Sequence, residues 1–134
     1  MELDSSKVEK KIEELRETKS CSQSTLMGLC EDTEYSQEDL SKIASGFSGG
    51  IGGTFAEGSC GAVTGATLAL GLLEEDEDKI KAYTKEMFEA FKDKYTSVRC
   101  DIISKNGEDK TLCTECCVFA GKKVCDLINK KNGF

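Results

Sequence analysis

Seven of the sixteen residues from Gly46 to Gly61 are glycine, and this run constrains the fold more than any other segment. Glycine costs a helix interior about 1 kcal/mol relative to alanine, so the run cannot belong to a stable helix. Three apolar residues inside it, Phe47, Ile51 and Phe55, can serve as anchors. Such anchors favour an ordered loop over a flexible connector. We therefore expect an ordered glycine-rich loop here.

Helical patterns lie on both sides of this loop. Apolar residues recur at helical spacing, and Ser20 or Ser22 and then Ser36 are suitable N-caps. The predicted helical segments are Ser5–Thr18, one from about residue 20 to 30, Ser36–Gly46, Gly61–Leu73, residues 74–95, a short or irregular stretch Ser97–Ser104, and Asp109–Lys130. We expect an all-α fold, a compact bundle of five to six helices that forms one domain over residues 1–134.

The segment after the loop carries two rows of small residues at helical spacing. Gly61, Gly65 and Ala69 form one row, and Ala62 and Ala66 form its neighbour. Such rows let another backbone approach closely. The partner could be a helix of the same chain or of a second subunit, and the sequence leaves both open. Together with the amount of apolar helix face, the rows lead us to predict a homodimer.

Charge and composition exclude several functions. The 18 basic and 25 acidic residues give a net charge of −7, which opposes binding to nucleic acid or anionic lipid. The absence of His and Trp excludes Ser-His-Asp and Cys-His catalysis, Cys/His zinc fingers and His-ligated haem. No apolar run reaches the roughly 18 residues of a membrane helix, and the charged N-terminus does not resemble a signal peptide. We expect a cytoplasmic protein with no membrane partner.

Eight cysteines are the chemically distinctive feature of the chain. In a reducing compartment, cysteines outside simple core positions are more often metal ligands or redox groups than structural disulfides. Cys30 and Cys125 lie within apolar helical patterns and are predicted to be core residues. Cys113 and Cys116 form a CxxC motif, but no predicted strand precedes it and no His follows it. Neither thioredoxin-like use nor haem attachment is therefore indicated.

Four other thiols lie at or near predicted helix starts on four different segments. The helix dipole and exposed amides at such positions favour the thiolate, which is the form that binds metal. These four are Cys21, Cys60, Cys100 and Cys113.

Four motifs in this order resemble the C_GCAxxG_C_C family of redox-active proteins. They are SCSQSTL from Ser20, CGAVTGA from Cys60, SVRCDII from Ser97 and CTECCVFAG from Cys113, within a resemblance over about Val8–Lys130. The resemblance implies a small, mostly helical protein of anaerobic organisms with redox or iron–sulfur function. It also implies that the family's cysteine positions fall on Cys21, Cys60, Cys100 and Cys113.

The chain departs from the family pattern in three places. The glycine loop is longer and lacks a basic residue, and the segment between Cys100 and Cys113 is short. Cys116 and Cys117 replace apolar residues. Beside Cys113, these two thiols could act as additional ligands, bind a second metal or form a dithiol.

Three functions follow as hypotheses. The first is an iron–sulfur protein that transfers electrons to a redox partner protein, with the four family thiols as ligands and loop amides, including those of Gly58 and Gly61, donating to sulfur. The second is a metal-free dithiol oxidoreductase that uses Cys60 with Cys113, Cys116 or Cys117. The third is a binding module with a four-cysteine zinc site. No Walker A motif or dinucleotide fingerprint is present, so substrate turnover is not indicated.

Overall fold

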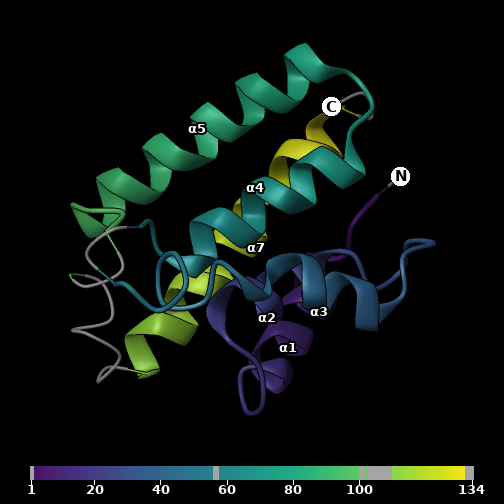
Figure 1. Ribbon diagram of the computed structural model, residues 1–134. Helices are drawn as coiled ribbons and strands as arrows, with labels where there is room; N and C mark the ends of the chain where they lie inside the picture. Colours follow the sequence, from purple (N-terminus) through teal and green to yellow (C-terminus); the bar gives the residue numbers. More distant parts are fainter. Residues whose placement is uncertain (1, 56–57, 100–101, 103–109, 132–134) are drawn as a thin grey trace.

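The computed structural model describes residues 2–55, 58–99, 102 and 110–131, and the fold in this part is all-α (Figure 1). The only bridge between extended segments among these residues joins Ser59 to Arg99. The predicted all-α bundle is therefore confirmed, although half of the predicted segment 97–104 lies outside the described residues. The helices are α1 (Ser5–Leu15), α2 (Cys21–Leu29), α3 (Gln37–Ser45), α4 (Gly61–Leu73), α5 (Glu77–Tyr95) and α7 (Lys110–Lys131).

Side-chain caps explain where three of these helices begin. The Ser20 hydroxyl accepts a hydrogen bond from the Gln23 amide, and the Gln23 side chain accepts one from the Ser20 amide. This capping box makes Ser20, rather than Ser22, the N-cap of α2. Ser36 caps α3 in the same way by accepting from the Asp39 amide at 3.1 Å. Asp76 caps α5, so that helix starts inside the acidic run rather than at its first residue.

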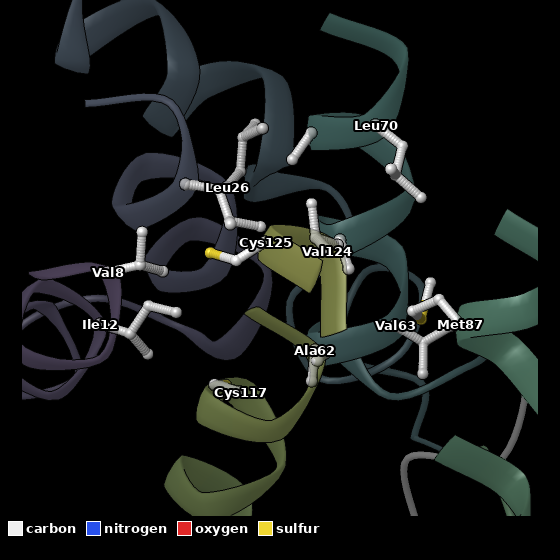
Figure 2. Close-up of a cluster of buried hydrophobic side chains, with 14 of the residues drawn as sticks. Val8, Ile12, Leu26, Ala62, Val63, Leu70, Met87, Cys117, Val124 and Cys125 are labelled. Carbon is white, nitrogen blue, oxygen red and sulfur yellow. The ribbon is translucent and has the colours of Figure 1, made fainter. Parts of the chain in front are cut away.

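Helix α2 lies inside the bundle and packs against α1, α3, α4 and α7. Figure 2 shows apolar side chains of α1, α2, α4, α5 and α7 meeting in one cluster, with Val124 of α7 near its middle. Helix α5 runs alongside α4 and packs against α4 and α7, on the far side of them from α1 (Figure 1). Within its apolar stripe only Met87 and Phe91 are fully buried.

Two glycines let α1 approach the rest of the bundle. A Cβ atom at Gly28 of α2 would lie 2.6 Å from the side chain of Ile12, and a Cβ at Gly121 of α7 would lie 2.6 Å from the same side chain. Real Cβ atoms do not come this close to another atom. Ile12 of α1 therefore occupies space that α2 and α7 leave open by lacking side chains at these positions.

The small-residue row of α4 packs against α2 of the same chain. A Cβ at Gly61 would lie 2.6 Å from the backbone nitrogen of Ser22, and a Cβ at Gly65 would lie 2.6 Å from the Ser22 carbonyl oxygen. Of the two partners that the sequence left open, the helix within the chain is the one in contact. The homodimer stays a prediction, and this row no longer supports it.

The described part of the glycine-rich segment is an ordered loop, as predicted. Four of its glycines have positive φ angles, which other residues rarely adopt. The Gly52 amide donates to the Gly46 carbonyl and the Phe55 amide to the Gly49 carbonyl, both at 2.8 Å. The prediction that Ile51 anchors the loop is wrong, because Ile51 is 46% exposed. Its backbone instead packs against Gly58, where a Cβ would lie 2.6 Å from the Ile51 nitrogen.

None of the helices in the described ranges combines the length and apolar character that a membrane crossing requires.

Candidate thiol site

Two of the predicted site residues meet where α2 and α7 begin. Cys21 is the first residue of α2, Cys113 lies in the opening turn of α7, and their sulfur atoms form a disulfide. The Cα atoms are 7.0 Å apart although 92 positions separate the two residues in sequence. Cys113 is 7% exposed, whereas Cys21 is half-buried. The more accessible residue of the pair is therefore Cys21 of α2.

A polar network surrounds the start of α2. Besides capping the helix, the Ser20 hydroxyl accepts a hydrogen bond from the Ser48 hydroxyl at 2.8 Å. The Gln23 amide group donates to the carbonyl oxygen and the hydroxyl of Ser41 in α3, each at 3.1 Å. The glycine-rich loop and α3 are thus both tied to the turn that carries Cys21.

The third predicted thiol, Cys60, lies at the start of α4 next to α2. It is the N-cap residue of α4 and is 1% exposed. Its amide donates to the Val98 carbonyl at 2.6 Å. The next residue, Gly61, touches α2 so closely that a Cβ there would lie 2.8 Å from the Cβ of Cys21. Three helices that carry predicted site cysteines therefore begin close to one another.

The remaining predicted members of the site have different outcomes. Cys100 follows Arg99, the partner of Ser59 in the extended bridge, but lies outside the described residues. Gly58 and Gly61 both sit in tight backbone packing. Donation from their amides to a cluster stays a prediction.

Cys117 lies one helical turn after Cys113 and faces the same end of α2. Its thiol donates to the backbone carbonyl oxygen of Cys21, with 3.7 Å between sulfur and oxygen. Burial raises the pKa of Cys117 to about 11, while the Thr25 hydroxyl and the positive charge of Arg16 act to lower it. At neutral pH this thiol is protonated.

Cys116 is also buried but belongs to a different environment. It lies beside the hydroxyl of Tyr95, which donates to a Glu115 carboxylate oxygen at 3.2 Å. Burial is the main cause that raises the pKa of Tyr95, and the charges of Cys116 and Glu115 add to it. Aromatic rings of Phe91 and Phe119 pack on Tyr95, with ring centroids 4.8 and 5.7 Å away. Cys116 thus lies beside an aromatic cluster.

Cys30 and Cys125 are core residues, as the sequence predicts. Both are fully buried, and burial raises the pKa of each thiol to about 12. Figure 2 shows the Cys125 sulfur among apolar side chains near Val8 and Leu26. Thiols with such pKa values are poor nucleophiles at neutral pH.

The chemistry of the described residues favours a two-sulfur site. No three Cys, Asp or Glu side chains among them come close enough together to bind a metal ion. They therefore provide two adjoining sulfurs, whereas an iron–sulfur cluster or a structural zinc ion takes four protein ligands. A pair of bonded sulfurs can accept two electrons and two protons and can exchange with other thiols.

The sequence does not indicate the pairing of Cys21 with Cys113 or the neighbours of Cys117. Cys60 is one predicted partner of Cys113, and the structure pairs Cys113 with Cys21 instead. A signal for the register was present, since Thr25 follows Cys21 by four residues and Cys117 follows Cys113 by four. Residues four apart share a helix face, so two helices joined at the first pair can also meet at the second.

Comparison with known proteins gives one match. A family model, C_GCAxxG_C_C, described as "Putative redox-active protein", matches residues 19–127. No curated protein and no solved structure matches the chain.

The family's name contains a Gly-Cys-Ala-x-x-Gly pattern, and this chain has its first two residues exchanged. Residues 60–65 read Cys-Gly-Ala-Val-Thr-Gly, so with Ala62 and Gly65 in register the pattern's cysteine falls on Gly61. Position 61 is where α4 touches Ser22 and Cys21, with no room for a Cβ. In this chain the thiol therefore stands one residue earlier, at the N-cap of α4.

Proposed function

Because the chain belongs to the C_GCAxxG_C_C family of redox-active proteins, we propose that it works by thiol–disulfide exchange, with Cys21 and Cys113 as its redox couple. The observation that carries this proposal is the bond between two cysteines at the starts of two packed helices. In the cytoplasm that the sequence predicts, a disulfide is typically transient and catalytic or redox-sensing rather than structural.

The exposure of the two sulfurs gives the order of the exchange. A thiolate of a partner dithiol attacks the half-buried sulfur of Cys21, and the Cys21–Cys113 bond breaks. Cys113 leaves as a thiolate in the opening turn of α7, where the helix dipole stabilises negative charge. The partner's second thiol then attacks the mixed disulfide. The partner ends oxidised, while Cys21 and Cys113 gain two electrons and two protons.

An iron–sulfur electron-transfer protein is the second candidate. The close starts of α2, α4 and α7 favour it, because each carries one of the cysteines that the family resemblance selects. Cys21, Cys60, Cys100 and Cys113 would hold the cluster, which would supply one-electron chemistry. The bond between Cys21 and Cys113 supports the exchange reaction more directly than the cluster.

The two candidates differ in an experiment on protein purified without oxygen. One portion is equilibrated in glutathione buffers of increasing potential, alkylated and mapped by mass spectrometry. Another is incubated with iron and sulfide and examined for visible absorbance and bound iron. We expect a Cys21–Cys113 disulfide that forms and disappears reversibly with a two-electron dependence on potential.

Two other results would decide against this function. A folded protein whose Cys21 and Cys113 both stay reduced in fully oxidising glutathione contradicts the couple. Stoichiometric iron with visible absorbance that disappears in Cys60→Ala moves the assignment to the iron–sulfur protein. Cys125→Ala is the matched control, because Cys125 is buried away from the pair and should change neither readout.

A further inference from the structure

Two cysteines of α7, one helical turn apart, both contact the start of α2. Cys113 bonds to the sulfur of Cys21, and the sulfur of Cys117 lies 3.7 Å from the Cys21 carbonyl oxygen. Since Cys113 and Cys117 share a face of α7, both are presented to the same residue. The proposed redox couple does not involve Cys117.

A buried hydroxyl beside Cys117 is also unexplained by the couple. Thr25 is fully buried, and within the described part of the chain its hydroxyl oxygen has no hydrogen-bond partner. An unsatisfied buried hydroxyl costs roughly 1–3 kcal/mol. Yet this hydroxyl lies close enough to the Cys117 sulfur to favour its thiolate. A hydroxyl in this position can donate to a thiolate when one forms.

We infer that Cys117 is an internal exchange partner of the couple, which displaces Cys113 and bonds to Cys21 one turn deeper in the bundle. This inference rests on the proposed function. The small fraction of Cys117 that is thiolate attacks the Cys21 sulfur, the Cys21–Cys113 bond breaks, and Cys113 leaves with the proton that Cys117 gave up. One disulfide replaces another, so no electrons are gained or lost and no outside oxidant is required.

The exchange changes which thiol of α7 is free. Cys117 is 0% exposed, so a Cys21–Cys117 bond has one fully buried sulfur, and Cys113 returns as a thiol in the opening turn of α7. The oxidised protein would then have two forms. Both keep the same oxidising equivalents and the Cys21 sulfur, and they differ in whether Cys113 or Cys117 is the free thiol.

The test removes Cys113 and identifies the cysteine that then forms a disulfide with Cys21. Cys113→Ser protein is treated with oxidised glutathione, digested without reduction and mapped by mass spectrometry. Glutathione first bonds to the accessible Cys21, and we expect Cys117 to displace it, so that most molecules contain a Cys21–Cys117 disulfide. Cys21 that remains joined to glutathione in a folded Cys113→Ser protein would overturn the inference.

Matched double variants identify the thiol that takes part. Cys113→Ser/Cys117→Ser should lose the new disulfide. Cys113→Ser/Cys116→Ser should keep it, because Cys116 faces Tyr95. Retention in the first variant, or loss from a folded second variant, would contradict the role of Cys117. In the Cys113→Ser background, Thr25→Val should slow formation about tenfold by removing the hydroxyl that stabilises the thiolate.

Disulfide mapping of wild-type protein distinguishes failure of this inference from failure of the proposed function. It also gives a result that does not depend on whether the variants fold. Rapid acid quenching of oxidised wild-type protein should capture Cys21–Cys113 together with a smaller amount of Cys21–Cys117. Finding the first bond alone contradicts only the inference. A wild-type protein that forms no Cys21–Cys113 bond contradicts the proposed couple, while the Cys113→Ser result still reports on Cys117.

Discussion

The same two helices carry cysteines in two opposite environments. Helix α2 has Cys21 as its first residue and Cys30 as its C-cap, and α7 has Cys113 in its opening turn and Cys125 three turns later. Cys21 and Cys113 are bonded to each other, and Cys21 is partly exposed. Cys30 and Cys125 are completely buried and outside that bond.

The difference shows that the position of a cysteine along a helix decides its chemistry here. The start of α2 offers helix-end amides and the hydroxyls of Ser20 and Ser48. Cys30 and Cys125 have apolar surroundings, and burial raises the pKa of each to about 12. One region can stabilise a thiolate, and the other keeps sulfur protonated as a small apolar group.

Substitution of one cysteine in each environment should give the largest difference between two variants. Cys21→Ser should abolish the intramolecular disulfide, because it removes the sulfur to which Cys113 is bonded. Cys30→Ala should leave the redox midpoint unchanged and lower the free energy of unfolding by roughly 1–3 kcal/mol through lost packing. Glutathione titration and urea unfolding measure the two effects. A shifted midpoint in Cys30→Ala would show that the two regions are not independent.

The close contact of α4 with the start of α2 provides the next contrast, between two glycines of one helix. Gly65→Ala should lower the free energy of unfolding by about 1–3 kcal/mol, because the new Cβ would lie 2.6 Å from the Ser22 carbonyl oxygen. Gly71 faces open space, so Gly71→Ala should raise it by about 0.5–1 kcal/mol. Urea unfolding tests both signs, and equal effects would contradict the contact.

Alkaline pH should lower the free energy of unfolding through the buried Cys30 thiol. Burial raises the pKa of Cys30 from its usual 9.0 to about 12, so between these values the unfolded chain loses a proton that the folded chain keeps. The free energy of unfolding therefore falls as pH rises through this window, by up to about 1.4 kcal/mol per pH unit for this thiol. Urea unfolding at pH 8.5 and 10.5 should show a smaller decrease in Cys30→Ala. Equal decreases in both proteins would contradict the raised pKa.

The features that the sequence predicted well depend on neighbouring residues. Ser20 and Ser36 cap helices through bonds to residues three positions on, and Gly61–Leu73 is the helix that its composition predicts. These local preferences act within one or two helical turns. The positions of Cys21, Cys60 and Cys113 at or near helix starts followed from the same rules.

The features that the sequence could not give depend on how helices pack. The pairing of Cys21 with Cys113 follows from the contact of two helices at opposite ends of the chain. The small-residue row of α4 indicated close packing but not that α2 is its partner. Ile51 has the residue type of an anchor, yet the turns built on positive-φ glycines leave it exposed. Each outcome depends on residues far away in sequence.

If Cys21 and Cys113 form the proposed redox couple, the hydrogen bond from Ser48 to Ser20 connects the glycine-rich loop to its redox state. Ser20 caps the helix that begins with Cys21, so a change at that cysteine alters the free energy of the loop conformation. Thermodynamic coupling is reciprocal. A ligand or antibody that prefers one loop conformation must therefore shift the equilibrium between dithiol and disulfide by the same factor by which oxidation changes its own affinity.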